Sequence, residues 1–337
     1  MLILSNSLTQ AADEGSLKLA TNLVKLIREK APGTTHIVTF ERQYPLSDEH
    51  LNLNKFHISM RLISLLRKQK QPVLYIPFPA PVTSMALRIF LLSVFARRGL
   101  RVMMVRQYPM GGLAKLLLRK SRAELIVFSE KACDFYKTVV GPRVLYVKAG
   151  VDTEKFTPVS QEKATALKLK YGIDPERPVV LHVGHMKDGR NVAELMKIAE
   201  EYQVLLVVST LAKERQNADL KNRLLQRPNI KILDTYLPNI EEIYQMCDVY
   251  FFPVVQAGHC IDVPLSCLEA AACDKPVVTT DYGEMQALVG TGGFYLLDDF
   301  NPQHINALLD RAMLDREPGT RAMVMEYDYE NAIELLA

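Results

Sequence analysis

Residues 263–283 read VPLSCLEAAACDKPVVTTDYG, and this stretch says more about the fold than any other part of the chain. Pro264 suits the first turn of a helix, where its missing N–H costs no hydrogen bond. The Asp-Lys-Pro sequence at residues 274–276 stops that helix, and the β-branched run at 277–280 favours a buried strand. The stretch therefore predicts a helix, a turn and a strand.

The start of this helix is a candidate ligand site. The N–H groups of Leu265, Ser266 and Cys267 have no acceptor earlier in the helix, so they form a natural seat for an anion. Glu269 follows one to two turns later and offers a carboxylate to sugar hydroxyls. We expect a nucleotide to bind here, with its phosphate at the helix start and its sugar on Glu269.

Strand and helix patterns alternate in both halves of the chain. Strands are expected at residues 1–4, 36–40, 72–77, 101–105, 125–129 and 144–147, and again at 179–183, 204–209, 230–233, 249–252 and 277–280. This alternation is typical of an α/β fold with parallel sheets covered by helices on both faces. We predict two doubly wound, Rossmann-like domains facing across a cleft, with the ligand at the carboxyl ends of the strands. The expected boundaries are residues 1–160 and 161–337, with the C-terminal tail returning to the first domain.

Three segments resemble one known family, the retaining family 4 glycosyltransferases of the GT-B fold. Residues 263–283 resemble its donor-site signature, which reads P-L-x-x-L-E-A-M-A-C-G-x-P-V-V-x-T. Residues 147–158, VKAGVDTEKFTP, resemble the segment that ends the family's first domain, and residues 183–191, VGHMKDGRN, resemble its V-G-R-L-x-x-x-K-G loop. The resemblance implies transfer of a hexose from a nucleotide-sugar donor to an acceptor, with retained configuration and no metal cofactor.

The resemblance also assigns roles to individual residues. Glu269 takes the position of the glutamate that holds the ribose, whereas the family's sugar-binding glutamate, eight positions earlier, falls on Ile261. Asp262 is adjacent and is expected to replace it. Arg190 takes the position of the family's lysine and His185 that of its arginine, and Lys187 adds a further cation beside the donor diphosphate. Basic residues simply facing solvent are the alternative reading of this loop. We expect Arg190, Lys187 and Asp262 to be catalytic.

Further donor contacts are expected around these residues. They comprise Gly184, His185, Gly258, His259, Cys260, Leu265, Ser266, Tyr236, Leu237, Gly15 and Ser16. Four of these residues have a plainer alternative: Tyr236 fills the cleft instead of stacking on a base, His259 only lines its loop, and Gly15 and Ser16 cap a helix instead of touching phosphate.

The first domain lacks the histidine that many family members place near the reaction centre. The comparable positions are Phe78 and Pro79, or Arg106 and Gln107. No general base is therefore visible. Retention does not require one, because the leaving diphosphate itself can accept the proton while the protein stabilises its developing charge.

The small net charge of +3 conceals two halves of opposite sign. Residues 1–150 hold 23 Lys and Arg against 9 Asp and Glu, and the remaining residues hold 18 against 29. Residues 50–122 contain 14 Lys and Arg and no acidic residue. This imbalance predicts contact with an anionic membrane surface or an anionic acceptor. A solubilising face that also attracts the acidic half is the alternative. The helix expected at 111–120 lies in the membrane interface on the first reading and is an ordinary surface helix on the second.

Other features narrow the class of protein. The five cysteines have no metal-ligand spacing and are expected to be free thiols, and no strand leads into G-x-G-x-x-G, which argues against a dinucleotide-dependent oxidoreductase. The polar Asn6 and Ser7 interrupt the apolar start, so we expect a cytoplasmic protein, peripheral to the membrane if the basic region binds lipid. The partners expected are a nucleotide sugar and an acceptor glycan, lipid or small molecule, and no nucleic acid. A catalytically weak GT-B protein that binds a nucleotide sugar or a partner is the alternative function.

Overall fold

The computed structural model describes residues 1–6, 8, 15–40, 43–53, 58–77, 82–105, 110–209 and 217–336. It divides into two compact units. Unit 1 comprises Met1–Ala149 and Tyr329–Ala337, and unit 2 comprises Gly150–Asp328. The first unit thus ends before residue 160, and the last helix of the chain belongs to it.

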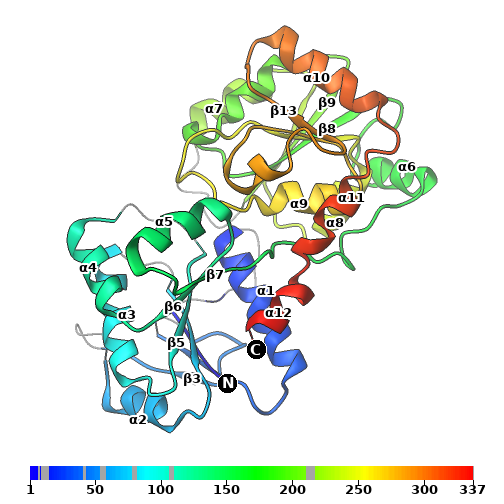
Figure 1. Ribbon diagram of the computed structural model, residues 1–337. Coiled ribbons are helices and arrows are strands. Elements are labelled where there is room, and N and C mark those ends of the chain that lie inside the picture. Colours follow the sequence, from blue (N-terminus) through cyan, green and yellow to red (C-terminus); the bar gives the residue numbers. More distant parts are fainter. Residues whose placement is uncertain are drawn as a thin grey trace. The chain divides into compact units, whose positions relative to one another are not determined.

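Unit 1 is built on a seven-stranded parallel sheet with the order β3-β2-β1-β4-β5-β6-β7 (Figure 1). The strands are β1 Leu2–Ser5, β2 His36–Thr39, β3 Glu49–His50, β4 Val73–Ile76, β5 Leu100–Met103, β6 Glu124–Val127 and β7 Val144–Tyr146. The helices are α1 Gly15–Lys30, α2 Met60–Lys68, α3 Val82–Phe95, α4 Gly112–Lys120, α5 Glu130–Val140 and α12 Tyr329–Leu336. Every residue of β1 and of β4 is buried, as expected for central strands covered on both faces.

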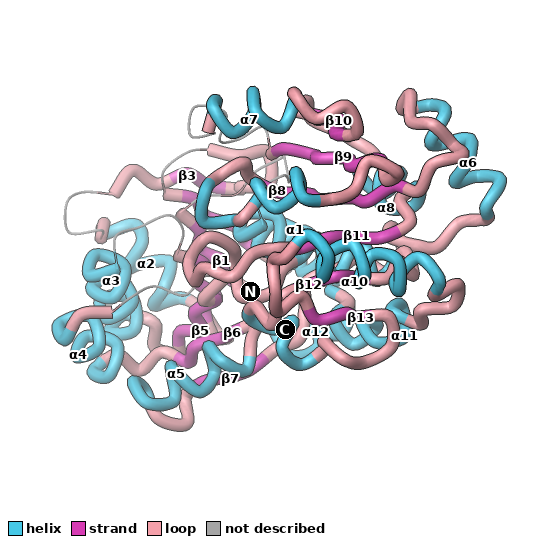
Figure 2. The backbone as a smooth tube through the Cα atoms, turned by 90° about the horizontal axis from the view of Figure 1, so that it is seen from above, coloured by secondary structure: helices cyan, strands magenta, loops and turns pink. Residues whose placement is uncertain are grey.

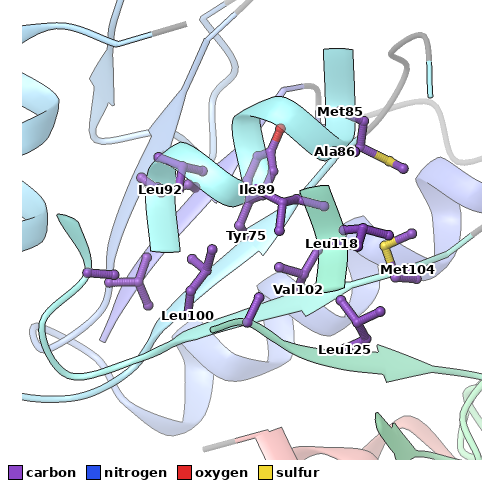
Figure 3. Packing of buried hydrophobic residues seen from close by; sticks show 14 of the residues in the cluster. Tyr75, Met85, Ala86, Ile89, Leu92, Leu100, Val102, Met104, Leu118 and Leu125 are labelled. Atoms are coloured by element: carbon purple, nitrogen blue, oxygen red, sulfur yellow. The ribbon is translucent and has the colours of Figure 1, made fainter. Parts of the chain in front are cut away.

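Helices α3 and α4 pack on one face of this sheet. Figure 3 shows Ile89 and Leu92 of α3 and Leu118 of α4 against side chains of the strands. Residues of α2 and α5 join the same cluster, among them Leu62 and Tyr136. The apolar stretch at 85–96 therefore belongs to a core helix.

Helix α12 completes the opposite side of unit 1, where it packs against α1 (Figure 1). Lys30 of α1 forms an ion pair with Glu330 of α12. Arg101 of β5 donates from Nη1 to the backbone oxygens of Leu335 and Leu336, at 3.4 Å each. The end of the described chain is thus fastened to its first helix and to its sheet.

Unit 2 repeats the architecture with a six-stranded parallel sheet, in the order β10-β9-β8-β11-β12-β13. The strands are β8 Val179–Gly184, β9 Gln203–Val208, β10 Ile230–Leu233, β11 Val249–Phe252, β12 Val277–Thr279 and β13 Phe294–Leu296. The helices are α6 Gln161–Lys170, α7 Ala218–Leu225, α8 Ile240–Met246, α9 Leu265–Ala272, α10 Pro302–Leu314 and α11 Thr320–Val324. Short 3₁₀ turns follow at Asp188–Arg190, Val192–Lys197, Gly283–Ala287 and Met325–Tyr327. Both sheets have the 3-2-1-4-5-6 order of the doubly wound fold, which confirms the predicted fold class.

The winding direction of unit 2 reverses between β8 and β11. From β8 the chain builds outward through β9 to β10, and from β11 it builds the other way through β12 to β13 (Figure 2). The loops after these two central strands therefore diverge, and such switch points are where open α/β sheets bind ligands. The loop after β8 runs to the turn at Asp188–Arg190, and the loop after β11 runs to α9.

Unit 2 begins and ends at the same place. The backbone N–H groups of Gly150 and Val151 both donate to the oxygen of Tyr327, at 2.9 and 3.2 Å. Asp328 accepts hydrogen bonds from the backbone N–H and the hydroxyl of Thr153. A Cβ at Gly150 would lie 2.6 Å from Cδ1 of Leu268, so this glycine allows the entering chain to contact α9.

A buried ion pair anchors α6 to the start of the unit 2 sheet. Lys168 is buried, and its Nζ lies 2.8 Å from a carboxylate oxygen of Asp248, which also accepts from the backbone N–H of Val179.

Asp248→Asn should lower the free energy of unfolding by about 2 kcal/mol, because a buried ammonium loses its counter-charge. Chemical denaturation measures this change. Glu200→Gln, which alters the exposed pair with Arg227, is the matched control and should change stability by less than about 0.5 kcal/mol. Equal effects of the two variants would contradict the assigned role of the buried pair.

Candidate functional site

The loop after β8 gathers basic side chains at the switch point. Gly184 ends the strand, His185 is buried, and Lys187 and Arg190 are partly exposed. Two backbone hydrogen bonds shape the loop, from Lys187 N–H to the oxygen of His185 and from Arg190 N–H to that of Lys187, both at 3.0 Å. Asn191 then adopts a left-handed conformation, with φ of 54°. After this loop the chain forms a short 3₁₀ turn at Val192–Lys197.

Arg190 connects this loop to the one after β11. Its Nε donates to the backbone oxygen of His259 at 2.9 Å. On the other side, a Cβ at Gly184 would lie 2.6 Å from Nη1 of Arg190. The imidazole of His259 packs so closely on Gly189 that a Cβ there would come within 2.2 Å of Nδ1. Gly184, Arg190 and His259, which were predicted as site residues from separate motifs, therefore meet.

The loop after β11 is held from the side of β12. The hydroxyl of Tyr282 donates to the backbone oxygen of Cys260 at 2.7 Å, and the N–H of Cys260 lies 3.3 Å from the same hydroxyl. Burial raises the pKa of Tyr282 to about 12, so it remains a donor at physiological pH. The backbone oxygen of Asp262 accepts from the N–H of Glu284 at 2.8 Å. Gly258, with φ of 84°, makes the turn that this loop needs.

The start of α9 differs in detail from the sequence-based prediction. Pro264 occupies the N-cap, one position before the helix, and not its first turn. Its backbone oxygen accepts from the N–H of Cys267 at 3.0 Å, so that group is not available to an anion as predicted. Ser266 is the one residue of α9 that is not buried, and it follows Leu265 at the helix start.

Glu269 lies deeper than a surface ligand contact. It is only 3% exposed, although it stands one turn into α9 as expected. Its carboxyl neighbours the hydroxyl of Tyr244 of α8, and burial together with this carboxylate raises the pKa of Tyr244 well above its usual value. Ile261, at the position of the second glutamate of the family signature, is buried, whereas Asp262 is partly exposed.

Other predicted site residues belong to other elements. Tyr236 and Leu237 follow β10, two strands from β8 in the sheet, and Tyr236 is 51% exposed. Gly15 and Ser16 start α1 of unit 1, where Ser16 is fully buried. Phe78, Pro79, Arg106 and Gln107, the positions compared with the family's histidine, lie outside the described residues.

Metal ligands were sought in the same regions. Within the described ranges, no group of three or more His, Cys, Asp or Glu side chains is arranged to hold a metal ion. All five cysteines are free thiols, and Cys260 alone among them is partly exposed.

His182 of β8 lies next to Gly184 and was not among the predicted site residues. It is fully buried, and its Nδ1 lies 2.9 Å from the backbone oxygen of Phe251, so Nδ1 carries the proton. Nε2 faces the underside of Gly184, where a Cβ would lie 3.2 Å away. Burial lowers the pKa of His182 to about 4. The His-Val-Gly sequence at residues 182–184 was visible, but not the side to which the imidazole points.

The depressed pKa of His182 makes stability depend on pH. The unfolded chain binds a proton at this histidine below its usual pKa of 6.5, whereas the folded chain does so only near pH 4. Stability is therefore lost as the pH falls through this window, by about 2–3 kcal/mol between pH 7 and about 4.5. Denaturation at both pH values should show a smaller acid loss in His182→Phe than in the wild type. Equal losses would place the titration elsewhere.

Comparison with known proteins gives a family match within unit 2. Residues 177–315 match the family described as Glycosyl transferases group 1. The chain is 26% identical over 185 residues to alpha-maltose-1-phosphate synthase of Mycolicibacterium smegmatis (51% of this chain, 46% of that protein). It is 20% identical over 146 residues to alpha-galactosylglucosyldiacylglycerol synthase of Streptococcus pneumoniae (41% and 38%). The matches thus span less than half the length of these relatives.

The fold extends over the whole chain. HepE of Anabaena, solved in complex with UDP, superposes with a TM-score of 0.78 at 13% identity, covering 99% of this chain and 97% of that one. At this identity the likeness speaks for the fold alone. Together with the sheet order of both units, it shows that the chain has the GT-B fold, and residues 177–315 of unit 2 match the group 1 glycosyltransferases.

Proposed function

We propose that the chain transfers a sugar from a nucleotide-sugar donor to an acceptor with retention of configuration, and that unit 2 binds the donor. Structures of HepE with UDP, with UDP and glucose, and with UDP-glucose support a donor of this kind for a chain of this fold. The observation that carries the proposal is the position of Arg190, held between Gly184 and the backbone of His259 at the switch point.

In this proposal the diphosphate binds at the divergence of the two loops. Arg190 and Lys187 supply positive charge, His185 lies beside them, and the N–H groups of Leu265 and Ser266 lie at the start of α9. These groups stabilise the negative charge that develops on the leaving diphosphate. This stabilisation is strongest in the transition state. The diphosphate itself then accepts the proton of the acceptor hydroxyl.

The remaining parts of the donor extend from this point. The transferred sugar lies along Gly258, His259 and Cys260, with Asp262 replacing the glutamate that Ile261 lacks. Glu269 holds the ribose, and Tyr236 and Leu237 lie near the base. Gly15 and Ser16 of unit 1 contribute to the phosphate site. No metal ion takes part.

Because Glu269 is buried, a role in ribose binding must be distinguished from a role in the packing of unit 2, and one substitution can do so. Glu269→Gln keeps the side-chain volume but removes the charge, so a ribose contact predicts an affinity loss of about tenfold or more, since a charge-assisted hydrogen bond contributes roughly 1.5–3 kcal/mol. A thermal-shift screen of nucleoside diphosphates and nucleotide sugars selects the ligand, and calorimetry measures the affinity. Tyr244→Phe is the matched control for disturbing the α8–α9 contact. Unchanged affinity combined with a lower melting temperature would assign Glu269 to the core of unit 2.

The acceptor side of the proposal rests on unit 1. Arg97 and Arg98 follow α3, and Arg119 and Lys120 end α4, all of them exposed. Leu113 and Leu116 of α4 are 59% and 49% exposed beside them. Apolar and basic side chains on adjacent, packed helices are the composition of a membrane-interface surface. This supports an acceptor at, or in, an anionic membrane.

Not every basic residue of the acid-free stretch adds to this surface. Arg61 pairs with Glu49, Arg101 pairs with Glu124, and Arg88 is buried. The acidic partners come from outside residues 50–122, which the sequence pattern did not reveal. Across the described residues, no helix combines the length and the apolar character needed to cross a membrane.

Vesicle binding tests the membrane surface. Replacing Arg97, Arg98, Arg119 and Lys120 with glutamine should abolish most sedimentation with anionic vesicles and leave nucleotide affinity unchanged, because each basic residue near the surface contributes about 1 kcal/mol. Binding of the wild type should also weaken as salt shortens the Debye length from about 10 Å at 0.1 M to about 3 Å at 1 M. The matched control replaces Lys163, Arg223, Arg311 and Arg316 of unit 2 with glutamine. Equal sedimentation with neutral and anionic vesicles, or equal loss in both variants, would favour the solubilising-face alternative.

A further inference from the structure

His182 presents a hydrogen-bond acceptor inside unit 2. Its Nδ1 lies 2.9 Å from the backbone oxygen of Phe251 on the neighbouring strand β11. A carbonyl oxygen only accepts, so Nδ1 is the donor and Nε2 carries the lone pair. Within the described part of the chain, Nε2 is buried and has no hydrogen-bond partner. The low pKa of the imidazole keeps it neutral at physiological pH.

This lone pair and the guanidinium of Arg190 border the same small space. A Cβ built on Gly184 would lie 3.2 Å from Nε2 of His182, 2.6 Å from Nη1 of Arg190 and 3.8 Å from its Cζ. The missing side chain of Gly184 therefore leaves the two groups facing each other. Arg190 is fixed at the opposite side of its guanidinium, where Nε donates to the backbone of His259.

We propose that His182 is a positioning residue for Arg190. When the donor diphosphate is bound, the neutral Nε2 of His182 is the second acceptor of the guanidinium, after the backbone oxygen of His259. This contact directs the remaining N–H groups of Arg190 toward the diphosphate. This inference rests on the proposed function, since it takes Arg190 as a phosphate ligand. Guanidinium recognition of phosphate depends on the orientation of its planar fork, so a side chain that sets this plane changes affinity without touching the ligand.

A purely packing role accounts less well for the histidine. The imidazole lies between the rings of Tyr250 and Phe252, at centroid distances of 6.4 and 6.5 Å, where an apolar ring of similar size would fit. An acceptor buried without a partner destabilises the fold, and a phenyl ring would avoid this cost. When the diphosphate draws Arg190 forward, its guanidinium becomes the partner of Nε2. The cost of the unpaired acceptor is then removed in the bound state.

The experiment is a double-mutant cycle between the two residues. His182→Phe keeps the ring and removes the acceptor, His182→Gln can restore an acceptor oxygen, and Arg190→Ala removes the guanidinium. Calorimetry compares binding of the nucleoside diphosphate selected by the thermal-shift screen with binding of its nucleoside. Melting temperatures at pH 7 confirm that each variant is folded.

His182→Phe should weaken diphosphate binding about tenfold in the wild-type background, leave nucleoside binding unchanged, and have no further effect when Arg190 is already alanine. His182→Gln should retain more affinity than His182→Phe. Equal losses in both backgrounds, or a matching loss of nucleoside affinity, would overturn the proposal as general damage to the fold. A loss from Arg190→Ala with none from His182→Phe overturns only the role of His182. Unchanged affinity in Arg190→Ala overturns the phosphate role of Arg190 and the inference with it.

Discussion

The parallel pairing of β8 with β11, with the chain winding away from each strand in opposite directions, is the constraint on which the candidate site depends. Parallel strands place their carboxyl ends at one edge of the sheet. Because the chain winds away from β8 and β11 in opposite directions, no crossover connection covers the gap between the carboxyl ends of these two strands. Two loops far apart in sequence are thereby brought close enough for Arg190 to donate to the backbone of His259. The topology of the sheet, and not proximity in the sequence, brings the basic residues of one loop next to the backbone of the other.

Small residues decide how close these loops come. Gly184 admits the guanidinium of Arg190, Gly189 admits the imidazole of His259, and Gly283 admits the backbone of Asp262, whose oxygen would lie 2.1 Å from an added Cβ. Each contact fills the place of a side chain with a polar group from another residue of the site. The site is therefore assembled largely by backbone approach, which explains why residues with little chemistry of their own accompany Arg190.

Strand positions were predictable because central parallel strands are buried on both faces and read as β-branched or aromatic runs. The exact bounds predicted for β10 and β11 are confirmed. Strand β3 consists of the polar pair Glu49–His50, and strand β13 has only three residues, so neither strand was predicted. The burial of Glu269 and the direction of His182 depend on neighbours from other elements, and no local pattern encodes them. The roles of the predicted site residues remain predictions.

The adjoining entry and exit of unit 2 have a consequence for the order of folding. Unit 2 is an insertion: all of its residues leave the ribosome before α12, which unit 1 needs to cover α1 and to pair Lys30 with Glu330. The later domain can thus close its core while the earlier one still exposes an apolar helix face. A chain truncated shortly before residue 329 would contain a complete unit 2 and an incomplete unit 1, and chaperones would recognise the uncovered side of α1.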